Sequence, residues 1–127
     1  MKLLDTMVLV SAVNPDDKYH KTGMTHVDSL RSPAEVYVPT STLTEFDLVL
    51  RNRGYDETEV IETWAALAPL IGDKTTAVTP SAHLSAAEIR REGLSYFDSL
   101  IAALAKEIGA IVVTRDPQIA RHLSTEW

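Results

Sequence analysis

Apolar residues along the chain follow two patterns: short continuous runs, and longer segments with helical spacing. Short apolar or β-branched runs are typical of buried strands, whereas recurrence at every third or fourth position is typical of helices packed on one face. The short runs predict strands at residues 2–4, 34–38, 75–78 and 110–114. The longer segments predict helices at residues 6–13, 16–31, 40–53, 56–71, 80–91, 96–108 and 116–123.

Glycine and proline separate these segments. A glycine after the last apolar position of a helix favours its termination, and four glycines stand at such places: Gly54, Gly72, Gly93 and Gly109. Pro69 is expected to bend or shorten the helix that contains it. Strands alternating with helices predict an α/β fold, a three-layer α/β/α sandwich around a mainly parallel sheet of four to five strands. Residues 124–127 leave room only for a short fifth strand or none, and residues 1–127 are expected to form one domain.

Composition narrows the kinds of site that the chain can hold. The 127 residues are 45% hydrophobic and 24% charged, which is ordinary for a globular protein. No apolar run reaches the roughly 18 residues of a membrane span, so we expect no membrane partner and a cytoplasmic location. Without cysteine, a metal ion must be held by oxygen or imidazole ligands. A net charge of -6 argues against indiscriminate nucleic-acid binding but is compatible with acids gathered at a metal site.

Four acids occupy positions where a parallel sheet places its functional sites, at the carboxyl ends of strands. Asp5 follows the first predicted strand directly, and Asp116 lies two residues beyond the apolar run of the fourth. Glu45 lies in the first turns of the helix after the second strand. Asp98 lies in the first turn of the helix that leads into the fourth. The pattern therefore allows all four carboxylates to face one crevice.

Each of these acids also has a purely structural interpretation. Asp116 before Pro117 is a favourable helix N-cap, and Asp5 before a helix can serve the same purpose. Residues 42–45 match a capping box that would occupy Glu45, and residues 95–98 have the same hydroxyl-to-acid spacing. An acid in a first turn is also favoured by the helix dipole. No single acid establishes chemistry on its own.

The surroundings of Asp5 and Asp98 favour a bound cation. Both acids interrupt otherwise apolar stretches, 3–10 and 96–104, which implies partial removal from water. Such burial is costly for a carboxylate unless a positive charge pairs with it, and neither acid has a lysine or arginine next to it in sequence. Oxygen-only ligands select hard ions such as Mg²⁺ or Mn²⁺.

At these positions the sequence resembles the PIN-domain ribonucleases, especially the single-domain toxins of toxin–antitoxin pairs, the VapC kind. The most specific part is residues 97–116, which looks like the family's third acid, its helix, its fourth strand and a closing Thr-x-Asp. Leu4-Asp5-Thr6 resembles the family's opening, and residues 42–46 resemble its second acid block. The resemblance identifies Asp5, Glu45, Asp98 and Asp116 as the catalytic and metal-binding acids.

This resemblance implies a PIN-like fold and hydrolysis of RNA phosphodiester bonds by an endoribonuclease that needs Mg²⁺ or Mn²⁺. Asp5, Asp98 and Asp116 would be ligands of one or two ions. Glu45 would be a further ligand or help to deprotonate the attacking water. Thr6 and Thr114 would orient a carboxylate or a ligand water. The implied partners are an RNA substrate, a cognate antitoxin protein and a second copy of the chain in a homodimer.

Two further positions and two other functions stay open. Met7 stands where the family often has Asn or Ser, so a small polar contact near the metal is missing and metal affinity is expected to be weaker. Arg115, between two site residues, is either an RNA contact or a solvated loop arginine. A catalytically inactive PIN-like binding module remains an alternative. A phosphoacceptor signalling domain is disfavoured, because Asp5 lacks the paired acid of that class and no lysine follows Lys106.

Overall fold

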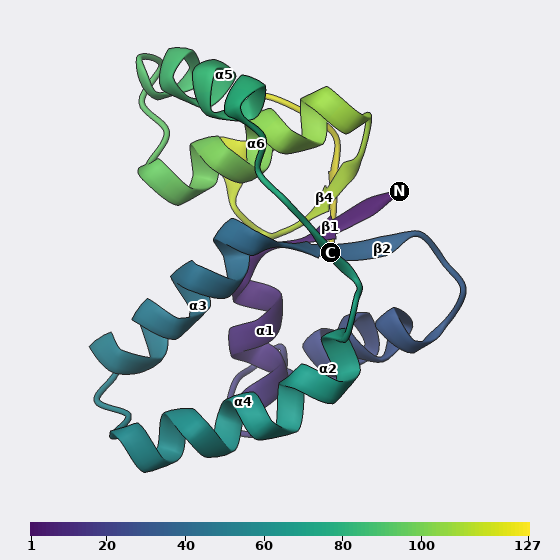
Figure 1. Ribbon diagram of the computed structural model, residues 1–127, viewed down its shortest axis with the longest axis vertical. Helices are drawn as coiled ribbons and strands as arrows, with labels where there is room; N and C mark the ends of the chain where they lie inside the picture. The colour runs from purple at the N-terminus through teal and green to yellow at the C-terminus, as the bar shows by residue number, and fades with distance from the viewer.

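A parallel sheet lies at the centre of the molecule in the computed structural model, which describes all of residues 1–127 (Figure 1). Its strands are β1 (Lys2–Leu4), β2 (Val36–Pro39), β3 (Thr75–Thr76), β4 (Ile111–Val113) and β5 (Thr125–Glu126). They pair in the order β3-β2-β1-β4-β5, and every pair is parallel. The predicted α/β fold is confirmed, and the fifth strand is present but short.

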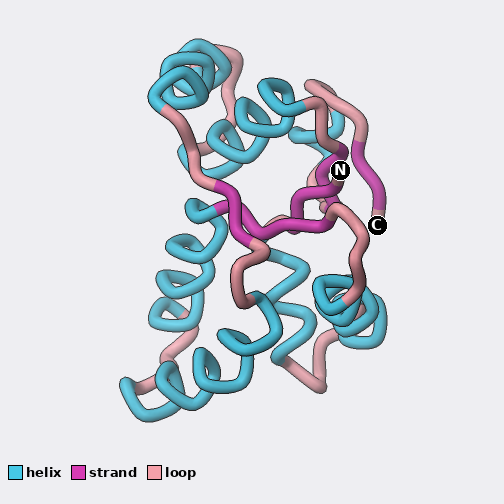
Figure 2. Tube along the Cα trace, turned by 45° about the vertical axis from the view of Figure 1, so that its right-hand side comes forward, coloured by secondary structure: helices cyan, strands magenta, loops and turns pink.

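Helices cover both faces of this sheet. They are α1 (Thr6–Val13), α2 (His20–Asp28), the 3₁₀ turn η1 (Ser29–Arg31), α3 (Thr40–Asn52), α4 (Glu57–Ile71), α5 (Pro80–Arg90), α6 (Tyr96–Ile108) and α7 (Pro117–Ala120). Helices α1 to α4 lie on one side and α5 and α6 on the other, which gives the three expected layers (Figure 2). None of the helices combines the length and the apolar character needed to cross a membrane.

The central strands β1 and β4 are buried on both faces, which explains their continuous apolar sequences. Successive side chains of a strand point to opposite faces of the sheet. Leu4 and Val113 therefore join the core on the α1–α4 side, whereas Leu3 and Val112 join the core under α6. This double burial fixes the register of the two strands that carry Asp5 and Asp116 at their ends.

The second helix begins at His20 rather than at residue 16. The side chain of Asn14 accepts a hydrogen bond from the amide of Asp16 at 3.1 Å, and that of Asp17 accepts one from the amide of Tyr19 at 2.8 Å. Such local bonds hold the backbone in turns and compete with helix formation. The amphipathic pattern predicted a helix in residues 16–19, but polar side chains in and next to this segment bind the local backbone, so the helix begins only at His20.

Pro69 does not shorten α4, which reaches Ile71 as its apolar pattern predicts. A proline after the first turn of a helix removes one backbone donor, and its ring crowds the carbonyl four residues earlier. The hydrogen bond at the end of the helix is nevertheless present: the amide of Gly72 donates to the carbonyl of Ala68 at 2.8 Å. The last turn of α4 therefore closes in spite of Pro69.

The edge strand β3 and the last helix α7 are shorter than predicted. β3 ends at Thr76, and Val78 packs instead against the apolar clusters around α5 and α6. Likewise α7 ends at Ala120, and Leu123 packs against the same clusters. Because Val78 and Leu123 are partly buried against these helices, neither β3 nor α7 extends to the residue that the sequence predicts.

Candidate active site

Four carboxylates from distant parts of the sequence gather at the carboxyl edge of the sheet. Asp5 follows β1 and Asp116 follows β4, and these two strands are paired neighbours. Glu45 lies in the second turn of α3, which begins directly after β2, and Asp98 is the third residue of α6. Each of the four charges acts on at least one of the others. The structure therefore brings together all four acids singled out in the sequence.

Asp5 is held through both of its carboxylate oxygens. Its side chain is only 5% exposed. The amide of Thr6 donates to Oδ1 at 2.7 Å, so Asp5 is the N-cap of α1, and the hydroxyl of Thr114 donates to Oδ2 at 2.7 Å. Thr114 in turn accepts a hydrogen bond from the amide of Asp116 at 3.0 Å. This chain of bonds ties the ends of β1 and β4 together.

Glu45 is bonded to the other predicted supporting threonine. The hydroxyl of Thr6 donates to Oε1 of Glu45. The alternative in which Glu45 belongs to a capping box is wrong, because α3 begins at Thr40, and Thr42 already lies inside its first turn. The buried hydroxyl of Thr42 donates instead to the carbonyl of Leu4 at 3.3 Å, which joins the start of α3 to β1.

Asp98 and Asp116 each lie at the start of a helix. The amide of Asp98 donates to the hydroxyl of Ser95, the N-cap of α6, at 3.4 Å. The amide of Gln118 donates to Oδ1 of Asp116, the N-cap of α7, at 2.8 Å. The capping interpretation of Asp5 and Asp116 is thus confirmed, and it coexists with their place in the acid cluster.

Burial and mutual repulsion raise the pKa of three of these acids. The pKa of Asp98 is raised to about 6, mainly by burial and also by the charges of Asp116 and Asp5, against the opposing bond from Ser95. Burial raises the pKa of Glu45, and the charges of Asp5 and Asp98 add to it. Burial also raises the pKa of Asp5, although Thr114 and Thr6 oppose the shift. The cluster thus carries negative charge that the surrounding protein does not balance.

No side chain of the protein neutralises this cluster. The five ion pairs of the chain involve none of the four acids. Carboxylates are the ligands that hard divalent ions prefer, so the donor chemistry fits Mg²⁺ or Mn²⁺. No group of three or more His, Asp or Glu side chains already has the spacing of a metal site. Side-chain rotation would have to bring the carboxylates together around an ion.

Arg115 lies beside the cluster in sequence but turns away from its carboxylates. Its guanidinium carbon lies 3.5 Å from the ring centroid of Tyr19 and 5.0 Å from that of Trp127. The two rings meet edge to face, with centroids 5.7 Å apart. Sequence reasoning missed both aromatic partners, because Tyr19 lies 96 positions before Arg115 and Trp127 lies 12 positions after it, and no sequence motif connects the three residues.

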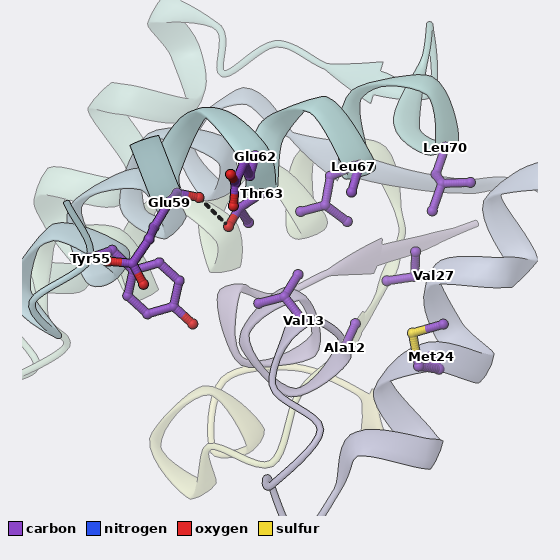
Figure 3. A pocket seen from close by; sticks show the side chains of 11 residues that line it. Ala12, Val13, Met24, Val27, Tyr55, Glu59, Glu62, Thr63, Leu67 and Leu70 are labelled. Atoms are coloured by element: carbon purple, nitrogen blue, oxygen red, sulfur yellow. Dashed lines mark hydrogen bonds between the residues drawn. The ribbon is translucent and has the colours of Figure 1, made fainter. Parts of the chain in front are cut away.

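The molecule also has an apolar groove of about 410 Å³ between α1, α2 and α4 (Figure 3). Val13, Met24 and Leu67 are among its apolar walls, and Glu59 and Glu62 project from α4 at one end. None of the four site acids lines it. The groove is therefore separate from the acid cluster.

Solved structures with the same fold come from several bacteria. FitAcB from Neisseria gonorrhoeae is 23% identical, with a TM-score of 0.75 over 100% of this chain and 97% of that one. VapC20 from Mycobacterium tuberculosis, described as a sarcin-ricin loop cleaving toxin, is 18% identical, with a TM-score of 0.73 over 95% and 94%. VapBC2 from Rickettsia felis, bound to promoter DNA, is 15% identical, with a TM-score of 0.73 over 99% and 98%.

At these identities the similarity establishes the fold. A comparison with curated proteins finds no match. The family model that describes the PIN domain matches residues 2–122, which include all four acids and nearly every element of the fold. The chain therefore belongs to the PIN domain family.

Proposed function

We propose that this protein is a metal-dependent endoribonuclease and the toxin of a toxin–antitoxin pair. The observation that carries the proposal is the cluster of Asp5, Glu45, Asp98 and Asp116, buried enough to raise three of the pKa values and without any basic partner in the chain. An acid cluster in such surroundings is typical of a site completed by a cation. RNA as the substrate and an antitoxin as the partner are supported by two structural neighbours, one described as a sarcin-ricin loop cleaving toxin and the other as VapBC2.

The proposed metal ligands are Asp5, Asp98 and Asp116, with Glu45 as a further ligand or a base. When bound, Mg²⁺ or Mn²⁺ would lower the pKa of a water and stabilise negative charge on the scissile phosphate and the leaving oxygen. Thr114 holds Oδ2 of Asp5 in place, and Thr6 holds Oε1 of Glu45, so these hydroxyls orient the two acids. In the role of base, Glu45 would accept the proton of the attacking water.

The experiment compares cleavage of a labelled structured RNA with Mg²⁺, with Mn²⁺ and with EDTA. Asp98→Asn keeps the shape of the side chain but removes its charge, and Asp73→Asn, an exposed acid outside the cluster, is the matched control. We expect metal-dependent cleavage that Asp98→Asn reduces at least about 100-fold, since even supporting residues of metal sites change activity by 10- to 100-fold. Asp73→Asn should cleave like the wild type.

Cleavage that persists in Asp98→Asn would show that the activity belongs to a contaminant or that the residue is misassigned. Cleavage that is equal in EDTA and in Mg²⁺ would contradict the metal dependence. Asp98→Asn and Asp73→Asn are both purified in the same way as the wild type.

A non-catalytic binding module is the second candidate function. Two features favour it: the carboxylates lack the spacing of a preformed metal site, and Met7, two residues after Asp5, offers no polar contact where the family often has Asn or Ser. Calorimetric titration with Mn²⁺ separates the two candidates. Absence of both metal binding and cleavage supports the binding module, whereas metal binding that Asp98→Asn abolishes supports the nuclease.

The proposed antitoxin would cover the acid cluster and supply positive charge to it, as an arginine inserted among the carboxylates would do. The proposed homodimer is tested by the mass of the isolated protein in solution. Co-purification of the toxin with an antitoxin, and loss of RNA cleavage in that complex, would support the pairing.

A further inference from the structure

We infer that Arg115 is a phosphate-binding residue for single-stranded RNA, held in position by Tyr19 and Trp127. The inference rests on the proposed function and adds a substrate-binding residue to it. Arg115 is exposed, and its neighbours Thr114 and Asp116 are both tied into the acid cluster. Its backbone is therefore fixed at the edge of the site.

The side chain of Arg115 is also held in one orientation. A separation of 3.5 Å between the guanidinium carbon and the ring centroid of Tyr19 places the planar group against the face of the ring. Tyr19 is itself restrained, because its amide donates to Oδ1 of Asp17 and its ring meets that of Trp127 edge to face. Stacking of this kind stabilises a cation and limits the entropy lost when it binds a ligand.

This arrangement leaves the hydrogen-bonding edge of the guanidinium available. Stacking uses the face of the group, whereas its five N–H donors lie in its plane. Arg115 takes part in no ion pair, although the chain has an excess of acids. Two of the other six arginines have their donors engaged: Arg51 pairs with Asp47 and Glu57, and Arg90 donates to the hydroxyl of Ser99. What distinguishes Arg115 is the combination of free donors, a stacked guanidinium and a place next to the acid cluster.

A nuclease with this charge distribution needs such a residue. The carboxylate cluster repels the RNA backbone, and the protein as a whole has a net charge of -6. A planar donor group next to the cluster matches the geometry of a phosphate and offsets this repulsion. Lys18, with its ammonium 5.3 Å from the ring centroid of Tyr19, adds a second positive charge near this ring.

The test measures RNA binding separately from cleavage. Binding of a fluorescent single-stranded RNA is followed by anisotropy in an Asp98→Asn background with Mg²⁺, between about 50 and 200 mM salt. Arg115→Gln should weaken binding about tenfold, the size expected for one charge-assisted contact. It should also lower the slope of log affinity against log salt by about 0.7, the value for one phosphate on a single strand.

The matched control is Arg31→Gln, which removes an exposed arginine before β2, at the opposite edge of the sheet. It should leave both affinity and salt slope unchanged. Tyr19→Leu keeps the charge of Arg115 but removes its support, so binding should weaken with the salt slope retained. A purely structural role for Arg115 would change thermal stability without changing the salt slope.

Two results would overturn the inference, and they differ in what they say of the nuclease. If the wild type cleaves RNA but Arg115→Gln keeps the parent's affinity and salt slope, Arg115 does not bind phosphate and the proposed function stands. If the wild type neither binds nor cleaves RNA, the proposed function fails and the inference fails with it.

Discussion

Asp5 illustrates how single residues set the chemistry of this site. The carboxylate is buried, which raises its pKa, and two hydrogen bonds from Thr6 and Thr114 oppose that rise. Asp5 also caps α1, so one residue both begins a helix and contributes to the acid cluster. The structural and functional interpretations of its sequence position are therefore complementary.

Replacement of Thr114 by valine tests this support at the scale of one hydroxyl. The change keeps the shape of the side chain but leaves Oδ2 of Asp5 and the amide of Asp116 without their partner. We expect a loss of about 1–3 kcal/mol in the free energy of unfolding, because buried polar groups left unsatisfied cost that much. Urea denaturation measures the stability, and calorimetry with Mn²⁺ measures an expected decrease in metal affinity.

Thr114→Ser, which retains the hydroxyl, is the control and should restore much of both properties. An unchanged unfolding midpoint together with unchanged Mn²⁺ affinity in Thr114→Val would show that the hydroxyl supports neither the fold nor the site.

At the scale of elements, the position of each acid follows from where a strand ends and a helix begins. β1 and β4 are paired in register, so the residues that follow them share one edge of the sheet. The sequence predicted the bounds of these elements well where the apolar run was long, as in α6, or where the strand was buried on both faces, as in β4. Predictions were poorer in segments 14–19 and 77–79, where side-chain bonds to the backbone or burial of one apolar residue decided the boundary.

The contact between α1 and α2 depends on Gly23. A Cβ atom at this position would lie 2.8 Å from the amide nitrogen of Ala12 and 2.9 Å from Cβ of Ser11. Gly23→Ala should therefore destabilise the protein by about 1–3 kcal/mol through overpacking, although alanine is the better helix former by about 1 kcal/mol. Urea denaturation measures the change.

Thr25→Ala, at an exposed position of the same helix, should change stability by only a few tenths of a kcal/mol. A Gly23→Ala protein as stable as the wild type would mean that α1 and α2 separate easily. In that case the start of α1 at Asp5 is also less firmly placed than the packing implies.

At the scale of the whole molecule, the acid cluster links stability to pH and to metal. Asp98, Asp5 and Glu45 have raised pKa values in the folded protein, so between about pH 4 and 6 the folded state binds more protons than the unfolded state. Stability in EDTA should therefore fall as the pH rises through this window. Asp47 and Glu57, whose pKa values are lowered from 3.8 and 4.5, act in the opposite direction near and below those values. Burial lowers the pKa of His26 from 6.5, so this single histidine also opposes the trend of the three acids.

Thermal unfolding in EDTA should give a melting temperature that is several degrees lower at pH 7 than at pH 5. Mg²⁺ or Mn²⁺ should restore it at pH 7 and have less effect at pH 5, where protons compete with the ion. Asp98→Asn should flatten the dependence on pH and remove much of the response to metal. A melting temperature in EDTA that rises from pH 5 to 7 would contradict the linkage.

The sequence by itself determined the α/β class, most helix and strand positions, and the four acids. Helices and strands can be predicted from local sequence, because each must present its apolar side chains to the core at a fixed spacing. The acids were identifiable because Asp5 and Asp98 interrupt apolar segments and because strand ends mark the functional edge of a parallel sheet.

Only the tertiary structure decided how these residues meet. The bond from Thr114 to Asp5, the freedom of Glu45 from a capping box, and the stacking of Arg115 on Tyr19 and Trp127 all join distant segments. Such contacts depend on strand order and on which helix faces which sheet edge, and these result from packing the whole chain at once. The spacing of residues along the sequence does not predict these contacts, because they form only when the whole core is packed.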